Sequence, residues 1–369
     1  MINKFFKNEK FDPKNNGLNL IRLLLALCVI VTHGFALTGA SSGVTVGAID
    51  LGAWAVTGFF AISGYLIMAS RTNNRLAPYL LKRIARIIPA YLVCLLAVVL
   101  LFAPLAHLLM HGSLSGYLTT PPTPVDYFLS NANLAMVVGN YNIGDTLSLV
   151  PFSNTWNGVL YTLYYEFLCY LIIGFLMVLS IVRRHPKIIC WLFVISAILP
   201  FVIQAQYAAL SPHDSSNGLS ALLNIARFLP IFLGGAAVYV LKDKLINKFD
   251  FKLVVLSVVV VVAANFIPHI NYSEMGFLSP FILYILFWIS IKIRSLRISR
   301  FTRQNDISYG IYIYGWVIQQ MVMVLVINGL LPSLSIWLDI LLVAIITAVF
   351  AALSWVFVEK PILNRAKTI

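Results

Sequence analysis

The chain has 369 residues, of which 60% are hydrophobic and only 11% are charged. A water-soluble globular protein of this length has a more polar composition, so the sequence indicates an all-α, polytopic membrane protein. The net charge of +13 would suggest a nucleic-acid partner in a soluble protein. In a membrane protein, however, the charges are first interpreted by their positions relative to the bilayer. We therefore expect no nucleic-acid partner.

The beginning of the chain does not look like a cleavable signal peptide. Its first residues, Met1–Asn16, are polar and basic, and the apolar run behind them is long enough to span a membrane and lacks a small-residue cleavage site. The cysteines are scattered singly through apolar segments, without the spacing of a disulfide framework or a zinc site; they are Cys28, Cys94, Cys169 and Cys190. We therefore expect packing cysteines and no metal site.

Apolar stretches of about 20 residues predict ten membrane-spanning helices. In chain order they are Leu18–Leu37, Leu51–Ala69, Ile87–Leu109, Trp156–Val182, Ile188–Gln206, Leu219–Leu241, Leu253–Ile267, Gly276–Ile293, Ile307–Gly329 and Leu334–Val358. The stretch Tyr127–Gly139 is apolar but short, which favours a re-entrant or interfacial segment. We expect one transmembrane domain over residues 1–369, with no appended soluble domain.

The positions of lysine and arginine predict the orientation of these spans. Basic residues cluster at both ends of the chain and in every second connection. The intervening connections have no lysine or arginine; they are 38–50, 110–155, 207–218, 268–275 and 330–333. Because cytoplasmic connections carry the basic residues, this alternation predicts ten spans with both termini cytoplasmic. We expect a multi-pass protein of the cell inner membrane.

Two polar residues in the first span, Arg22 and His33, lie eleven residues apart. At 100° and about 1.5 Å per residue, they share one helix face and are separated by roughly 16 Å. The predicted orientation puts Arg22 near the cytoplasmic side and His33 in the outer half of the membrane. This pattern suggests a path into the membrane that is lined by polar side chains, with an anion bound at its entrance and proton transfer further in. The alternative is that Arg22 reaches lipid phosphates and His33 is a packing residue.

Two further ionisable residues lie within spans, namely Glu166 and Arg227. Ionisable groups in a membrane are expensive unless they are paired or face a hydrated cavity. With His33 they supply an acid, a base and a cation at comparable depth on three helices. In the alternative interpretation, Glu166 and Arg227 form a buried ion pair that only fixes helix packing.

Two short patterns suggest a place for a ligand. Arg83 and Arg86 lie at positions i and i+3 of a helix at the predicted cytoplasmic boundary, where such a pair can chelate phosphate or pyrophosphate. Ordinary anchoring of the span is the alternative. In the second span, Gly58, Ser63 and Gly64 permit close approach by a helix or a ligand, and tight packing explains them equally well.

Six motifs together resemble those of the acyltransferase-3 family of integral membrane O-acyltransferases, over nearly the whole chain. They are Arg22 with His33, FFAISGYLI at 59–67, KRIARIIPAY at 82–91, LYTLYYEFLCY at 160–170, ISYGIYIYGW at 307–316 and VEKP at 358–361. The resemblance implies transfer of an acyl group, usually acetyl from cytoplasmic acetyl-CoA, to a hydroxyl of a cell-surface glycan or lipid-linked saccharide. It implies that His33 is catalytic, that Arg22, Arg83 and Arg86 are associated with the acyl donor, and that Glu359 is associated with activity.

The sequence departs from the family pattern in two places. Many members carry a histidine where this chain has Gly315, so no second histidine is expected to act there. Many members also append an extracytoplasmic esterase-like domain, whereas this chain stops at Ile369.

These observations lead to a mechanistic hypothesis. Acyl-CoA is the donor substrate, with no tightly bound cofactor, and its phosphates bind the three arginines while its pantetheine arm follows the first helix. His33 acts as general base on the acceptor hydroxyl, and Glu166 orients the imidazole or the acceptor. The oxyanion is stabilised by Ser63, Tyr309 or Arg227. A covalent acyl-histidine is a variant of this scheme.

Two other classes of function fit parts of the pattern. A transporter or flippase for a lipid-linked sugar or an organic anion would also have many spans and charged groups near the midplane. A scaffold subunit of a polysaccharide export complex would show no turnover. The sequence leaves open the acceptor, the acyl chain length and the oligomeric state, and membrane lipids are the only other partner expected.

Overall fold

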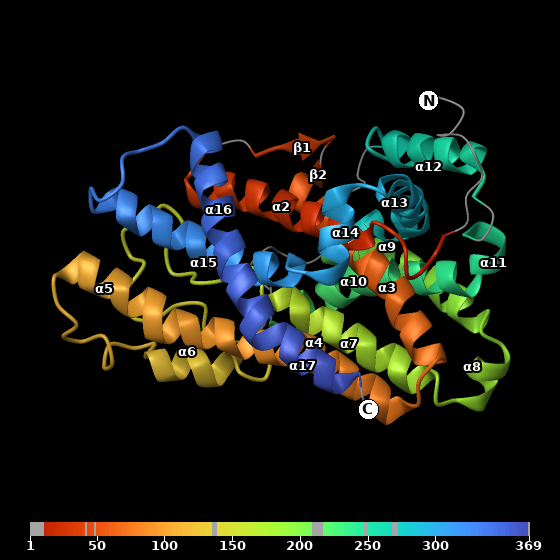
Figure 1. Ribbon diagram of the computed structural model, residues 1–369, viewed down its shortest axis with the longest axis horizontal. Helices are drawn as coiled ribbons and strands as arrows, with labels where there is room; N and C mark the ends of the chain where they lie inside the picture. The colour runs from red at the N-terminus through yellow and green to blue at the C-terminus, as the bar shows by residue number, and fades with distance from the viewer. Residues whose placement is uncertain are drawn as a thin grey trace. The chain divides into compact units, whose positions relative to one another are not determined.

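The computed structural model describes residues 11–40, 43–47, 49–134, 139–208, 217–246, 249–267 and 272–367. The chain is mostly helical (Figure 1). Its internal contacts divide it into two units: unit 1 consists of Met1–Leu25, Thr45–Leu80 and Tyr165–Asp306, and unit 2 of Ala26–Val44, Leu81–Tyr164 and Ile307–Ile369. Three of the five boundaries fall within the helices α2 (Leu18–Leu37), α4 (Leu76–Ala97) and α7 (Tyr161–Leu176), and the other two follow Val44 and Asp306.

Unit 1 contains a two-stranded hairpin and most of the middle of the chain. The antiparallel strands β1 (Thr45–Val46) and β2 (Ile49–Asp50) precede α3, whose first turn is capped by the side chain of Asp50. The helices of this unit are α3 (Leu51–Thr72), α8 (Ser180–Arg184), α9 (Ile188–Ala208), α10 (Asn217–Val240), α11 (Lys242–Leu245), α12 (Phe251–Ala264), the 3-10 helix η2 (Tyr272–Leu278), α13 (Ser279–Ile293) and α14 (Arg297–Gln304).

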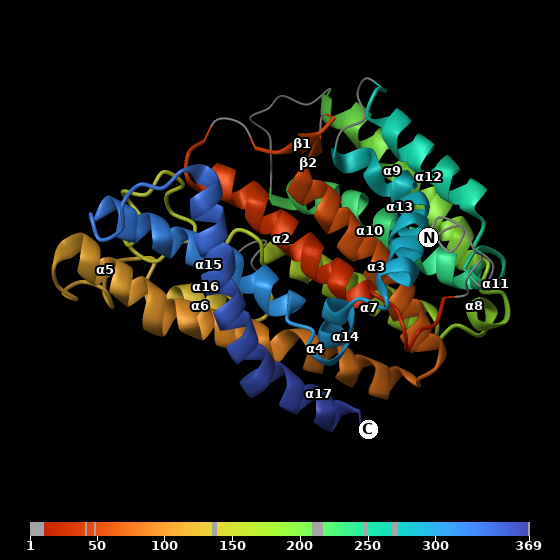
Figure 2. The ribbon, with the colours of Figure 1, turned by 45° about the horizontal axis from the view of Figure 1, so that its top comes forward.

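The centre of unit 1 is a close contact between α3 and α10 (Figure 2). A Cβ atom on Gly64 would collide with the backbone carbonyl of Phe232, and one on Gly235 would collide with the carbonyl of Ala61. Two glycines facing opposite helices therefore let the two backbones touch, as small residues do in membrane proteins. For Gly64, the predicted close approach is to another helix.

Unit 2 is built around one long helix and an antiparallel pair. Helix α4 continues without a break through the π-helical turn η1 (Val98–Phe102) into α5 (Ala103–His111), and the short helix α6 (Pro124–Asn131) packs on η1. Helix α15 (Ser308–Ile327) packs along α16 (Ile336–Ser354), with Gly310 against Ala351. Helix α16 then continues through η3 (Trp355–Glu359) into α17 (Lys360–Ala366).

The structure confirms the all-α membrane class. Among the described residues, seven helices are long and apolar enough to cross a membrane: 18–37, 51–72, 76–111, 221–240, 275–293, 308–327 and 336–366. The other three predicted spans fall on shorter apolar helices, Tyr161–Leu176, Ile188–Val202 and Phe251–Ala264. It stays a prediction that all ten segments cross the membrane and that both termini are cytoplasmic. The single transmembrane domain also stays a prediction.

Several predicted boundaries are wrong. The span predicted from Trp156 begins as a helix only at Tyr161, because the residues before it hydrogen-bond elsewhere: the Trp156 N–H donates to the Tyr141 carbonyl and the Val159 N–H to the Asn157 side chain. The span predicted from Ile87 begins at Leu76, since the basic turns before it are helical too. In the stretch Tyr127–Gly139, α6 covers the first part, and residues 135–138 lie outside the described part of the chain.

Candidate functional site

His33 is half-buried on α2 and belongs to unit 2. Its ring meets the indole of Trp316 from α15, with 4.7 Å between ring centroids and planes 61° apart. Close contact between the two helices is possible there because Gly315 has no side chain: a Cβ atom would lie 2.9 Å from Ile30 Cγ1 on α2. The position where the resemblance leads one to look for a second histidine is therefore a packing glycine in this chain.

Trp316 itself is held in place by the segment that precedes α7. Its Nε1–H donates to the Thr155 carbonyl at 3.0 Å, and its ring lies against Gly158. One turn further along α15, the Gln320 side chain donates to the carbonyls of both Phe152 and Thr155 at 2.8 Å. The indole that faces His33 is thus fixed on two sides. Sequence reasoning missed this support because the bonds go to backbone carbonyls.

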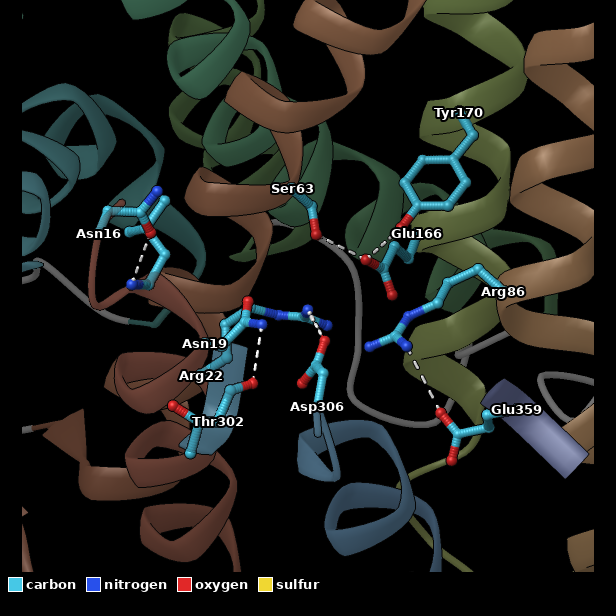
Figure 3. A network of polar contacts seen from close by, with 11 residues as sticks. Asn16, Asn19, Arg22, Ser63, Arg86, Glu166, Tyr170, Thr302, Asp306 and Glu359 are labelled. Carbon is cyan, nitrogen blue, oxygen red and sulfur yellow. Dashed lines mark hydrogen bonds and ion pairs between the residues drawn. The ribbon is translucent and has the colours of Figure 1, made fainter. Parts of the chain in front are cut away.

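Three residues singled out from the sequence come together near the N-terminal end of α15. The Arg86 guanidinium lies 3.5 Å from the carboxylate of Glu359 (Figure 3) and 5.7 Å from the ring centroid of Tyr309. Glu359 is 2% exposed and also accepts a hydrogen bond from Ser354. The Tyr309 hydroxyl donates to the Ile87 carbonyl at 2.9 Å. Arg83, half-buried, lies one turn earlier on α4, so the pair shares one helix face as predicted.

Arg22 has an acidic partner that the sequence analysis missed. Its guanidinium lies 2.7 Å from the carboxylate of Asp306, and the two side chains are 20% and 12% exposed (Figure 3). The neighbouring Asn19 side chain donates to the Thr302 carbonyl at 3.0 Å, so two bonds join this turn of α2 to the end of α14. The only available signal is that Asp306 is the one acid within the basic connection 292–306.

In unit 1 the structure brings together Ser63 and Glu166. The hydroxyls of Ser63 and Tyr170 both donate to Oε1 of Glu166, at 2.7 and 2.6 Å (Figure 3). A carboxylate oxygen with two hydroxyl donors has a fixed position. Arg227 is buried on α10, and its guanidinium lies 4.4 Å from the ring centroid of Phe228.

The candidate residues are therefore distributed over both units. Unit 1 holds Arg22, Ser63, Glu166 and Arg227, and unit 2 holds His33, Arg83, Arg86, Tyr309 and Glu359. Within unit 1, Ser63 meets Glu166. Within unit 2, Arg86 meets both Tyr309 and Glu359, and His33 meets an indole outside the predicted set.

Comparison with known proteins gives matches along nearly the whole chain. The chain is 29% identical over 356 residues to an O-acetyl transferase of Shigella phage Sf6, covering 96% of this chain and 97% of that protein. It is 26% identical over 366 residues to Nodulation protein 10 of Rhizobium leguminosarum bv. viciae, covering 96% and 95%. No solved structure gives a match. The family defined by the acyltransferase domain Acyl_transf_3 matches residues 15–359. The chain belongs to this acyltransferase-3 family, and it is an acyltransferase of the membrane-embedded kind.

Proposed function

We propose that this protein is an O-acetyltransferase that moves an acetyl or other short acyl group from cytoplasmic acyl-CoA to a hydroxyl of a cell-surface glycan or lipid-linked sugar. Membership of the family and similarity to an O-acetyl transferase over 96% of the chain support acyl transfer. They favour an enzyme over the transporter or scaffold that the sequence alone left open.

One observation carries the assignment of roles, namely that one face of α15 contacts both Arg86 and His33. Tyr309 lies beneath the Arg86 guanidinium, and Trp316 contacts the His33 ring. Seven residues of α-helix are close to two full turns, so Tyr309 and Trp316 share a face and lie about 10 Å apart along the axis. An extended pantetheine arm is long enough to cover that separation, with phosphate at one end and thioester at the other.

The donor end of this arrangement is the arginine pair. Phosphate oxygens have the charge and geometry to bind guanidinium groups in place of a carboxylate. The Arg86–Glu359 contact of 3.5 Å is longer than an optimal charged hydrogen bond, which favours exchange of Glu359 for a donor phosphate. On this basis we assign Arg86 to the donor. We propose the same role for Arg83, on the same face of α4, and for Arg22, as the family resemblance implies.

The chemical step is assigned to His33. Its neutral imidazole accepts the proton of the acceptor hydroxyl as the oxygen attacks the thioester carbonyl. The tetrahedral intermediate then collapses, the C–S bond breaks, and the imidazolium returns the proton to the CoA thiolate. Glu166, fixed by Ser63 and Tyr170, is proposed to position the imidazole or the acceptor. The hydroxyl protons of Ser63 and Tyr309 are donated to Glu166 and to the Ile87 carbonyl, so of the three candidates we retain Arg227 for stabilising the oxyanion.

The test is a turnover assay with the purified protein in detergent, acetyl-CoA labelled in its acetyl group, and a membrane glycan extract as acceptor. We expect release of free CoA thiol that depends on the acceptor, and label in a base-labile ester on the glycan. Stable label on the protein in the absence of acceptor would identify the acyl-histidine route instead. Binding of the glycan without any CoA release would contradict the proposed function.

A further inference from the structure

A histidine–histidine–aspartate cluster lies at the end of α5, apart from every residue assigned to acyl transfer. His107 and His111 are one helical turn apart, and Asp145 comes from the following connection. His107 Nδ1 lies 3.5 Å from Asp145 Oδ1, and His111 Nε2 lies 3.2 Å from Asp145 Oδ2. One ligand atom from each residue falls within 4.8 Å of the other two. Three side chains of metal-binding type thus lie close enough together to share one ion.

The hydrogen bonding of His107 directs its other nitrogen into this cluster. Its Nε2 lies 3.0 Å from the Ser115 carbonyl, and a carbonyl only accepts, so Nε2 carries a proton. In its neutral form the ring then presents a lone pair at Nδ1. The His107 side chain is 5% exposed. No described residue gives a hydrogen bond to His107 Nδ1 or to Asp145 Oδ1, although both atoms are buried.

We propose that His107, His111 and Asp145 bind a divalent transition-metal ion of the zinc type. Zinc binds nitrogen and oxygen ligands at about 2.0–2.2 Å in tetrahedral geometry, which places any two ligand atoms roughly 3.4 Å apart. The two N–O separations of 3.5 and 3.2 Å run to different oxygens of the Asp145 carboxylate, and each is close to that edge. The longer one exceeds a normal hydrogen bond. The Ser115 carbonyl is the outer partner that metal-binding histidines commonly have.

The loop that supplies Asp145 is held in place by other bonds. The Gly144 N–H donates to the Pro122 carbonyl at 2.7 Å, and the Thr146 hydroxyl donates to the Ile143 carbonyl and accepts from the Trp156 indole. A carboxylate on such a turn needs little reorganisation to bind an ion. The metal would join the connection 110–155 to the end of α5.

The exposure of the cluster fits an open fourth position. Asp145 and His111 are 47% and 36% exposed, so water completes the coordination shell and the ion enters from solvent. The uninterrupted helix from Leu76 to His111 has 36 residues, about 54 Å at the usual rise, which exceeds the thickness of the hydrocarbon core. His107 and His111 lie at the end of this helix opposite to Arg83 and Arg86, so the predicted orientation would put the proposed ion on the outer side of the membrane.

This proposal departs from the expectation that the chain has no metal site. The sequence showed only two histidines at the end of an apolar helix and an aspartate 34 residues beyond the second, and the fold of the intervening connection brings them together. The inference is independent of the proposed acyl transfer.

Zinc titration of the full-length protein tests the proposal. The protein is purified in detergent with an affinity tag that contains no histidine, treated with EDTA, exchanged into metal-free buffer and titrated by calorimetry. Cobalt absorption in the visible range reports the coordination geometry. The variants are Asp145→Asn and His111→Ala, both at partly exposed positions, and His185→Ala is the matched control, because His185 ends α8 outside the cluster.

We expect one zinc ion per chain for the wild type and for His185→Ala, with tetrahedral cobalt bands. Loss of an outer partner alone costs roughly 10–100-fold in metal affinity, so Asp145→Asn and His111→Ala should each weaken binding by at least about 100-fold. Unchanged melting temperatures without metal show that the variants fold. The absence of saturable binding, or equal binding by the cluster variants and the wild type, would overturn the proposal. The three side chains would then form only an ion-pair cluster.

Discussion

At the scale of single residues, two arginines assigned to the donor each have a carboxylate partner. Arg22 lies against Asp306 and Arg86 against Glu359. A partly buried guanidinium without a counter-charge is costly, so these carboxylates stabilise the arginines and hold them in position. Binding of a donor phosphate would then exchange one anion for another.

Replacing Arg86 tests this interpretation. Loss of a hydrogen bond between charged groups costs about 1.5–3 kcal/mol, so Arg86→Ala should raise KM for acyl-CoA about 10- to 150-fold with a smaller change in kcat. The KM of Arg86→Lys should lie between those of the wild type and Arg86→Ala, because lysine keeps the charge but lacks the bidentate geometry of the guanidinium group. Initial rates at varied acyl-CoA measure both constants. An unchanged KM with a reduced kcat would assign Arg86 to another role.

At the scale of elements, two glycines of α3 differ in what an added methyl group would meet: Gly64 faces α10, and Gly58 faces α2. In Gly64→Ala the new methyl group meets the fixed backbone of Phe232, whereas in Gly58→Ala, on the same helix, it meets the mobile end of Leu25 at 2.9 Å. Overpacking costs about 1–3 kcal/mol, and alanine is favoured over glycine in a helix by about 1 kcal/mol.

We therefore expect Gly64→Ala to lower the melting temperature clearly, and Gly58→Ala to leave it unchanged or raise it slightly. Thermal unfolding in detergent, followed by tryptophan fluorescence, measures both. Equal loss of stability in the two variants would show that the α3–α10 contact is not limited by backbone clash.

At the scale of the whole molecule, the apolar segments were predictable because burial in a membrane requires about 20 apolar residues per helix. The ends of the helices were harder to predict, because hydrogen bonds to distant segments determine where a helix begins, as they do at Trp156 and Asn157. The arginines could be found from their spacing. Their partners could not, because Asp306 lies 284 residues from Arg22 and local patterns carry no information on contacts at that separation.

The predicted orientation is also a property of the whole molecule. Because lysine and arginine are missing from 110–155 and occur at both termini, we expect the termini inside and this connection outside. Single cysteines in a cysteine-free background, introduced at Ser113 and near Lys367, can be labelled in intact cells with an impermeant maleimide. Labelling at position 113 only is expected. Labelling of both positions would contradict the orientation.

The imidazole of His33 is the centre of the proposed mechanism, and the decisive measurement is steady-state turnover of acetyl-CoA by His33→Ala. General-base catalysis contributes about 10²–10⁴-fold, so kcat should fall by at least about 100-fold, while the affinity for acyl-CoA and the melting temperature stay close to those of the wild type. Full turnover by His33→Ala would contradict the account.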